Sequence, residues 1–379
     1  MAGARVTHTL LDTALWDTTE TRVASPERAL APEVRRGPVP RPGSLPLAIA
    51  GLGTALPTRV VTNEELAARL DTNDEWIRSR TGIERRHVIG PTESTTTLAI
   101  AAAHAALADA QIAAADLGAI VVATSTPDTL LPATAPAVAA ALGCEAFAFD
   151  LNAACAGFVT ALATAAGLSA MVEGPVLVVG ADSMTGCVDP EDRTTAVLFG
   201  DGAGAVVLVA DEAGELGPFD LGSDGTQREL LHIPPGQLHV IMQGREIYRR
   251  AVARMASSSL AVLDRAQLTV ADVDLVVAHQ ANRRILDAVA ARIGVDADRV
   301  HVSVDRHGNT SAASIPLALA DARDAGRLRP GTTLLLTAFG AGLTWGSTLL
   351  TWRSAASAQA PKNDQTPDTV QIGWRHDHG

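Results

Sequence analysis

The chain has 379 residues, of which 47% are hydrophobic and only 3% are aromatic. This length allows one large domain or two fused halves, and the hydrophobic fraction is enough for a sizeable core packed mainly by Ala, Val and Leu. A formal net charge of −12 argues against nucleic acid as a general partner.

The cysteine content and the first residues indicate the compartment. Cys144, Cys155 and Cys187 are an odd number of cysteines in a long chain. No basic N-terminal segment runs into an apolar core of the signal-peptide type. We therefore expect a reducing, cytoplasmic setting without a disulfide framework.

Both ends of the chain lack a sustained periodic apolar pattern, so residues 1–44 and 354–379 are predicted to be disordered tails. Pro38, Pro40 and Pro42 fall at alternate positions in the first tail. His376 and His378 lie in the second. A closed metal site takes three or four ligands, so we expect no metal there.

Between the tails, short apolar runs typical of strands alternate with Ala-rich stretches typical of helices. Strands are predicted at 47–51, 119–124, 146–150, 176–180, 205–209, 275–278, 300–304, 333–337 and 343–351. Helices are predicted at 95–110, 132–142, 155–171, 245–264, 283–293 and 311–325. This alternation indicates an α/β fold of βαβ units. The pattern runs twice with a break near 211–245, which predicts similar halves at 45–215 and 216–353.

One stretch is long enough to cross a bilayer. Residues 151–172 carry no charge, but they are rich in Ala, Gly and Thr and are interrupted by Asn152 and Cys155. A helix that is apolar on all sides is also typical of a buried core. We therefore expect a central helix packed between two sheets, and no membrane span.

Cys155 lies in the sequence Ala153-Ala154-Cys155-Ala156-Gly157-Phe158, between an apolar strand and an uncharged helix. Amide hydrogens and the helix dipole at a helix N-terminus favour a thiolate, so we expect a lowered pKa and a nucleophile. The small neighbours would let a substrate carbonyl approach the backbone. The alternative for this motif alone is a buried structural cysteine.

Two further polar residues also lie at predicted strand-to-helix joints. His279 follows the apolar run 275–278, at the end of a strand where α/β active sites usually lie. Asn309 lies between Gly308 and Thr310, just before a helix. Each has an ordinary alternative, a histidine bonded to backbone or a helix cap. A thiol with two neutral hydrogen-bond donors suits thioester chemistry, in which an enolate must be stabilised.

The glycine-rich segments lead to different predictions. Residues 339–346 predict a tight turn between two apolar strands, whose backbone N–H groups would face a ligand oxygen; an ordinary hairpin is the alternative. Residues 199–205 lack the spacing G-x-G-x-x-G and lead into a strand, and 51–53 lack a third glycine. A dinucleotide site needs a strand, then the glycines, then a helix, so a dehydrogenase is excluded.

Together these motifs resemble the β-ketoacyl-[acyl-carrier-protein] synthase III family. The resemblance runs from about Leu47 to Trp352 and includes, in order, 74–77 with 80–83, 124–128, the Cys155 motif, 192–193 with 199–204, the His279 motif, the Asn309 motif and 339–346. It implies the thiolase fold, with two similar halves that form a five-layered αβαβα core. Elongating synthases carry a second histidine where Asn309 stands, which points to the initiating type. Plant-type polyketide synthases differ in the glycine loop.

The resemblance implies a decarboxylative condensation. Cys155 would accept the acyl group of an acyl-CoA, and His279 and Asn309 would stabilise the enolate of a malonyl group on an acyl carrier protein. The backbone N–H groups of Cys155 and Ala341 would hold the oxyanion. CoA is a substrate, no metal or redox cofactor is required, and a homodimer is expected, in fatty acid initiation or polyketide priming.

The resemblance also implies two binding regions. Trp76 would stack on the adenine of CoA, with Arg80 and Arg193 near its nucleotide; surface ion pairs are the alternative. A basic group on an otherwise acidic chain would dock the carrier protein, although a plain solvated face is possible. Its members are Arg245, Arg249, Arg250, Arg254 and Arg284.

More than one interpretation is open for the acyl pocket and for the reaction type. Tyr248 stands where the family commonly has phenylalanine, and Leu131 stands where some members place a larger aromatic that closes the neighbouring subunit's pocket. A smaller residue there would admit longer or branched starters. The alternative functions are acyl transfer to a hydroxyl or amine without condensation, and an inactive partner subunit, which should have lost the nucleophile Cys155.

Overall fold

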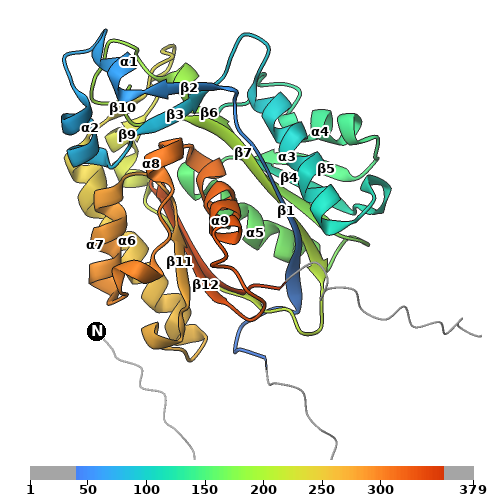
Figure 1. Cartoon of the computed structure of the whole chain (residues 1–379). Coiled ribbons are helices and arrows are strands. Elements are labelled where there is room, and N and C mark those ends of the chain that lie inside the picture. Colours follow the sequence, from blue (N-terminus) through green and yellow to red (C-terminus); the bar gives the residue numbers. More distant parts are fainter. Residues whose placement is uncertain (1–39, 354–379) are drawn as a thin grey trace, which may run out of the picture. The chain divides into compact units, whose positions relative to one another are not determined.

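A computed structural model describes residues 40–353 of the chain. Two sheets and three groups of helices stack in five layers in this part of the protein (Figure 1). The first sheet follows the order β1-β7-β6-β4-β5, and its strands are β1 (Leu47–Ala55), β4 (Ala119–Ala123), β5 (Phe147–Leu151), β6 (Val176–Ser183) and β7 (Asp201–Ala210). The second sheet follows the order β11-β12-β13-β8, and its strands are β8 (Leu216–Ser223), β11 (Leu275–Ala278), β12 (Thr333–Gly340) and β13 (Thr344–Thr351).

Helices cover both sheets and separate them. The helices α3 (Thr95–Ala110) and α4 (Thr134–Leu142) cover the outer face of the first sheet, and α6 (Gly244–Arg265) and α7 (Arg283–Ile293) cover the second (Figure 1). The helices α5 (Gly157–Leu168) and α9 (Ser314–Asp324) pack between the two sheets. The predicted five-layered αβαβα arrangement is therefore confirmed.

The central layer explains the uncharged stretch that could have been read as a membrane span. Phe158, Ala161, Leu162 and Ala165 of α5 are all fully buried against the two sheets. A helix packed on all sides has no face for charged residues. Within residues 40–353 no helix combines the length and the apolar character needed to cross a membrane.

Smaller elements surround the layers. Two pairs of short strands are β2 (Arg59–Thr62) with β3 (Arg85–Val88), and β9 (Leu231–His232) with β10 (Ile241–Met242). The short helices are α1 (Asn63–Ala67), α2 (Asp74–Thr81) and α8 (Val304–His307). The 3₁₀ turns include η2 (Ala154–Ala156), η4 (Gly225–Leu230) and η7 (Ser311–Ala313).

Three predictions about elements are wrong. Residues 300–304 form no strand, because Val300 makes only an isolated bridge and the side-chain oxygen of Gln280 accepts the N–H groups of Ser303 (2.9 Å) and Val304 (3.2 Å). Residues 211–245 are not a break, since they contain β8, η4, β9 and β10. The glycine motif at 199–205 does not precede a strand but lies mostly within one, because β7 begins at Asp201.

The predicted N-terminal tail is shorter than expected where the structure describes it. Arg41 forms an ion pair with Glu215 (3.2 Å) and donates a hydrogen bond to Thr351 (2.9 Å). Leu45 then bridges to Leu216. Residues 40–44 are thus attached to the second sheet, whereas the rest of that tail, 1–39, and the C-terminal tail, 354–379, lie outside the described residues.

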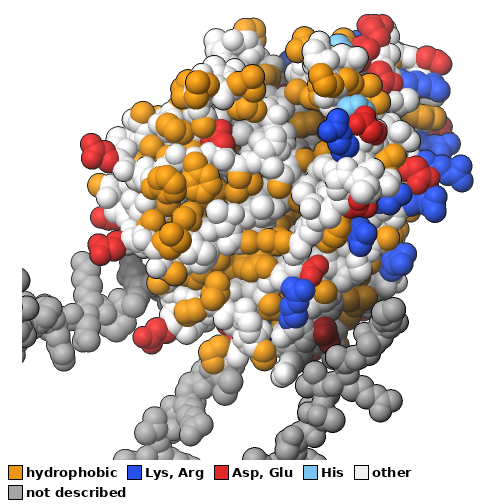
Figure 2. Space-filling view, turned by 180° about the vertical axis from the view of Figure 1, so that it is seen from behind, with side chains coloured by type: hydrophobic (Ala, Val, Ile, Leu, Met, Phe, Trp, Pro, Cys, Tyr) orange, Lys and Arg blue, Asp and Glu red, His pale blue; other side chains and the backbone are white. Residues whose placement is uncertain are grey.

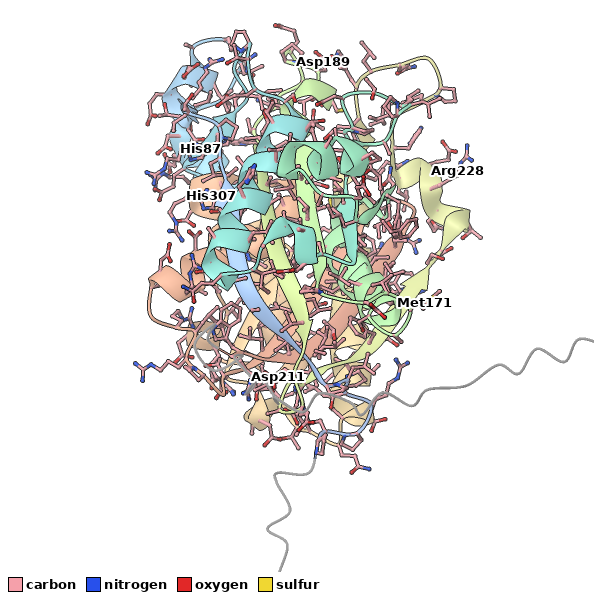
Figure 3. All side chains as sticks on the ribbon, turned by 90° about the vertical axis from the view of Figure 1, so that its right-hand side faces the viewer. His87, Met171, Asp189, Asp211, Arg228 and His307 are labelled. Atoms are coloured by element: carbon pink, nitrogen blue, oxygen red, sulfur yellow. The ribbon has the colours of Figure 1, made fainter. Side chains whose placement is uncertain are left out.

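The segment before Asn309 is held by elements far away in the sequence. His87 of β3 and His307 of α8 lie side by side, with ring centroids 5.9 Å apart (Figure 3). Gly200 approaches the same helix so closely that a Cβ there would lie 2.3 Å from the His307 carbonyl oxygen. Glycine is therefore required at 200 for packing.

Candidate active site

Cys155, His279 and Asn309 line one pocket of about 570 Å³. The three residues come from three joints along the chain: the turn between β5 and α5, the end of β11, and the segment between α8 and α9. The sequence placed each of them beside a strand or a helix end, and the structure brings them together. A pocket lined by a thiol and two neutral donors is able to hold a thioester.

Cys155 lies in the turn η2 rather than in the helix itself, because α5 begins two residues later at Gly157. Ala154, just before it, has a left-handed backbone with φ of 48°, which is strained for a residue with a side chain. The turn packs against the end of β12, where a Cβ at Gly340 would lie 2.6 Å from the Cys155 nitrogen. Only glycine fits at 340, so this contact fixes the position of the sulfur.

The expected low pKa of Cys155 is wrong. Burial raises the pKa of the thiol to about 12, and the nearby charge of Asp182 adds to the rise. Hydrogen bonds from Ser311 and from the backbone N–H of Cys155 act in the opposite direction but are smaller. The loss of hydration therefore outweighs the favourable helix end, and the resting residue is a thiol.

His279 is a neutral hydrogen-bond donor. It is almost fully buried, and burial lowers its pKa to about 3. The hydroxyl of Ser314 lies 2.6 Å from Nδ1 and accepts the backbone N–H of Gln280 (3.3 Å). Ser314 has its own hydrogen to donate to Nδ1, and in the tautomer that makes this bond Nε2 carries the imidazole hydrogen.

Asn309 is oriented by the turn that follows it. Its side-chain oxygen accepts the backbone N–H of Ser311 (2.9 Å), so the amide nitrogen is the group available to a ligand. Its backbone is fixed by hydrogen bonds with Leu198 (2.8 Å) and Gly200 (3.1 Å). The amide nitrogen of Asn309 and the imidazole of His279 therefore line the same pocket. Asn309 is not the N-cap of α9, which is Ala313.

The glycine turn lies beside the nucleophile. Within the described chain, the backbone N–H groups of Cys155 and Ala341 donate no hydrogen bond to another residue. Thr344 holds the turn, because its hydroxyl donates to the carbonyl groups of Ala153 and Ala341. These two N–H groups, with no partner in another residue, are therefore available to an oxyanion.

Trp76 and Arg80 line the same pocket as Cys155. Arg193 lies over the Trp76 ring, 5.3 Å from its centroid, and donates to the backbone oxygen of Asp71 (2.6 Å). An indole faced by a guanidinium is a suitable place for a planar heterocycle. The three residues predicted to contact CoA thus lie together.

The predicted docking arginines divide into two groups. Arg245 and Arg284 line the Cys155 pocket, and Arg284 lies over the ring of Tyr248, 5.6 Å from its centroid. The other three line a neighbouring hollow of about 580 Å³, formed by residues that include Arg249, Arg250, Arg254, Arg292 and Leu343. The sequence did not predict that Arg292 joins this group, because it is far in sequence from the arginines of α6.

The two residues predicted for the acyl pocket are separated. Tyr248 lines the Cys155 pocket. Leu131 is 89% exposed and does not line that pocket. Residues 40–353, which the structure describes, contain no cluster of three or more His, Cys, Asp or Glu side chains able to hold a metal.

Sequence reasoning missed three supporting residues: Ser311, Ser314 and Asp182. The two serines follow Asn309 in a segment of small residues. Their polar side chains at those positions could have indicated a supporting role. Asp182 ends an apolar run, and nothing in the sequence indicates that it lies behind Cys155.

Comparisons with known proteins identify two matching family models. Residues 149–225 match the model of 3-oxoacyl-[acyl-carrier-protein] synthase III, and residues 263–352 match the model of its C-terminal part. The β-ketoacyl-[acyl-carrier-protein] synthase III of Rhodobacter capsulatus is 52% identical over 318 residues, which cover 80% of this chain and 98% of that relative.

Solved structures agree. The 3-oxoacyl-(acyl carrier protein) synthase III of Pseudomonas aeruginosa is 47% identical with a TM-score of 0.78, and the match covers 81% of this chain and 98% of that one. The priming β-ketosynthase of the R1128 polyketide pathway is 36% identical with a TM-score of 0.76, covering 83% and 99%. These relatives confirm the thiolase fold.

The raised pKa of Cys155 predicts how the free thiol reacts. Below a pKa of about 12 the thiolate fraction rises tenfold for each pH unit. Alkylation of Cys155 by iodoacetamide should therefore accelerate about tenfold per unit from pH 7 to pH 9, because only the thiolate reacts. Peptide mass mapping measures the rate, and Cys155→Ser corrects for Cys144 and Cys187. A plateau below pH 9 would contradict the raised pKa.

Proposed function

The chain belongs to the β-ketoacyl-[acyl-carrier-protein] synthase III family, and we propose that Cys155 is its acyl-accepting nucleophile, with His279 and Asn309 as partners in condensation. The protein is an acyltransferase of the condensing type that starts fatty acid or polyketide chains. The observation that carries the residue assignment is the convergence of these three side chains in one pocket.

The first half-reaction is the transfer of an acyl group from CoA to Cys155. Trp76 and Arg80, which line the pocket, and Arg193, which lies over Trp76, hold the nucleotide part of CoA. The Cys155 sulfur attacks the thioester carbonyl, whose oxygen accepts hydrogen bonds from the backbone N–H groups of Cys155 and Ala341. Loss of one such donor costs about 3 kcal/mol of transition-state stabilisation.

The second half-reaction joins the acyl group to a malonyl carrier protein. Nε2 of His279 and the amide nitrogen of Asn309 donate hydrogen bonds to the thioester oxygen of the malonyl group. Both donors are neutral and buried, so they stabilise the negative charge that appears as carbon dioxide leaves. The enolate carbon then attacks the Cys155 thioester. CoA and the carrier are substrates, and no step calls for a metal or redox cofactor. A reducing cytoplasm would keep the nucleophile a thiol.

Intact mass spectrometry with a panel of acyl-CoAs tests this assignment. We expect an acyl adduct on the wild-type protein and none on Cys155→Ala. Addition of malonyl carrier protein should remove the adduct as β-ketoacyl carrier appears. His279→Ala and Asn309→Ala should still acylate, but their condensation rates should fall on the order of 100-fold, because each loses an enolate donor.

Three outcomes of that experiment would contradict parts of the proposal. An adduct that persists with malonyl carrier would indicate transfer to another acceptor without condensation. Acylation of Cys155→Ala would remove the nucleophile assignment. A strong preference for acetyl-CoA over all longer acyl-CoAs would contradict the expectation, based on Leu131, that the acyl pocket admits longer or branched starters.

The docking surface is proposed on the side of the molecule that carries α2, α6 and α7, where Figure 2 shows basic side chains gathered. Arg254 is held 4.5 Å from the ring centroid of Trp345, so its charge has a fixed place. Arg249 is 69% exposed in its side chain and pairs with Glu246. Carrier proteins are acidic, and opposite charges speed and orient their encounter.

Arg249→Glu tests this surface. KM for the malonyl carrier should rise about tenfold with kcat little changed, because a charge at the rim acts on association. Arg329→Glu is the matched control, since it makes the same charge change at an exposed position outside the pockets. Steady-state kinetics at low and high salt measure both variants. An unchanged KM for Arg249→Glu would contradict docking at this surface.

The proposal includes a homodimer. The strand β5 is the edge of the first sheet, and its Phe147 is 58% exposed. Leu130 and Leu131 are 98% and 89% exposed, and Figure 2 shows a broad apolar area away from the basic side. An unpaired edge with exposed apolar residues fits a second copy of the same chain, which would also bring Leu131 to the partner's acyl pocket.

Light scattering after size-exclusion chromatography tests the dimer. The wild-type protein should elute with twice the mass of the chain at micromolar concentration. Phe147→Asp should elute as a monomer, because it places a charge in the shared edge. Arg329→Glu again serves as a control that stays dimeric. A monomeric wild-type protein would contradict this assembly.

A further inference from the structure

Two buried side chains hold His279 and Asn309 from behind, and the condensation described above assigns no role to them. Gln280 is 1% exposed and Ser314 is 2% exposed. Gln280 follows His279 just after the end of β11, and Ser314 begins α9, just after the segment that carries Asn309. Each of them bonds to the element that carries the other proposed enolate donor.

The hydroxyl of Ser314 bonds to His279 and to the residue that follows it. Its oxygen lies 2.6 Å from Nδ1 of His279 and accepts the backbone N–H of Gln280 (3.3 Å). Within residues 40–353 this hydroxyl has no other hydrogen-bond partner. A buried hydroxyl that donates no hydrogen bond costs about 1–3 kcal/mol. The hydrogen of Ser314 is therefore given to Nδ1, the one acceptor within its reach.

This bond decides where His279 carries its own hydrogen. Burial lowers the pKa of the imidazole to about 3, so the ring is neutral at physiological pH. A neutral imidazole has one N–H group and one unprotonated nitrogen. Since Nδ1 accepts from Ser314, the N–H group is on Nε2. The other tautomer would place two hydrogens between atoms that are only 2.6 Å apart.

Gln280 connects the end of β11 to the segment that leads to Asn309. Its side-chain oxygen accepts the N–H groups of Ser303 (2.9 Å) and Val304 (3.2 Å), where α8 begins. The side chain of Ser303 does not cap this helix, so Gln280 supplies the cap from a different part of the chain. The helix α8 ends at His307, two residues before Asn309.

The amide nitrogen of Gln280 completes this connection. It donates to the carbonyl of Ala278 on β11 (2.8 Å) and to the carbonyl of His301 (3.2 Å), which precedes α8. Both hydrogens and both acceptor positions of the amide are thus in use. A buried polar network that is fully satisfied is rigid, so this one fixes the separation between β11 and α8.

We propose that Ser314 and Gln280 are positioning residues for condensation: Ser314 places the hydrogen of His279 on Nε2, and Gln280 sets the separation between His279 and Asn309. This inference rests on the proposed function of His279 and Asn309 as enolate donors. Neither Ser314 nor Gln280 lines the Cys155 pocket, so both act through the two donors.

The first half-reaction does not depend on this arrangement. In the proposed mechanism backbone N–H groups hold the oxygen of the acyl group during transfer to Cys155, whereas His279 and Asn309 hold the oxygen of the malonyl thioester. Two donors stabilise an enolate only when both are aimed at its oxygen. Loss of their direction or spacing should therefore slow condensation and leave acylation unchanged.

Nitrogen-15 NMR of the histidine rings tests the position of the hydrogen. The full chain is labelled in its imidazole nitrogens, and comparison with His279→Ala identifies the signals of His279. The wild-type protein should show a protonated Nε2 and an unprotonated Nδ1 at about pH 7. In Ser314→Ala the two tautomers should mix, because Nδ1 has lost its donor. A hydrogen on Nδ1 in the wild-type protein would overturn the inference.

Single-turnover kinetics measures the effect of Ser314 on condensation. Acyl-Cys155 is formed first, free acyl-CoA is removed, and malonyl carrier protein is then added. Ser314→Ala should form the adduct at the wild-type rate, but the β-ketoacyl carrier should appear about 10- to 100-fold more slowly, because a small misplacement of a group can cost this much. An unchanged condensation rate, or equal slowing of both steps, would overturn the role of Ser314.

Gln280→Glu tests the separation of the two donors. The variant keeps an oxygen that can cap α8, but it loses at least one of the hydrogen bonds given to Ala278 and His301. Condensation should slow about tenfold while acylation is unchanged. The hydrogen of His279 should stay on Nε2, because Ser314 is intact. Loss of acylation as well would assign Gln280 to the stability of the fold and overturn its positioning role.

Ser347→Ala is the matched control. Ser347 is fully buried in β13 and donates to the hydroxyl of Thr337 (2.8 Å), so the variant also removes one buried hydroxyl but does not reach the His279 ring. Both half-reactions and the His279 signals should match the wild-type protein. Slower condensation in Ser347→Ala, equal to that in Ser314→Ala, would overturn the inference. A wild-type protein that forms no acyl adduct would contradict the proposed function instead.

Discussion

Close backbone packing around Cys155 is the constraint on which the site depends. The end of β12 approaches the nucleophile turn so closely that residue 340 has no room for a Cβ. The segment carrying Asn309 is held in the same way by Gly200, next to α8. Protein interiors are as dense as organic crystals, so such contacts allow little adjustment. The pocket is therefore defined by backbone that cannot move without breaking the core.

Burial then sets the electrostatics of the site. The same layers that fix the backbone remove water from Cys155 and His279, which makes one a thiol and the other a neutral imidazole at physiological pH. A neutral histidine is suited to donate a hydrogen bond to an enolate, but it cannot also take a proton from the thiol.

Charged residues are constrained less on the surface than in the interior. The chain is acidic overall, with a net charge of −12, yet arginines from α6 and α7 gather beside the pocket. Exposed charges cost little and act over several ångströms, so they can guide an acidic partner without disturbing the fold. The basic residues and the apolar edge at β5 lie on different parts of the surface, which leaves each free for its own partner (Figure 2).

The sequence by itself predicted the two-sheet α/β fold and the central helix and singled out Cys155, His279 and Asn309 as candidates, because periodicity and short motifs are local properties of the chain. It also indicated the glycine turn near Ala341. Tertiary structure decided what depends on distant neighbours. Residues 300–304 form no strand, because the side chain of Gln280 accepts a backbone N–H that a strand would pair. Burial raises the pKa of Cys155, whereas the sequence predicted a lowered one. Asp182 became part of the site only because β6 lies against the segment that carries Asn309. Hydration and long-range packing are set by the folded core, and no local pattern in the sequence encodes them.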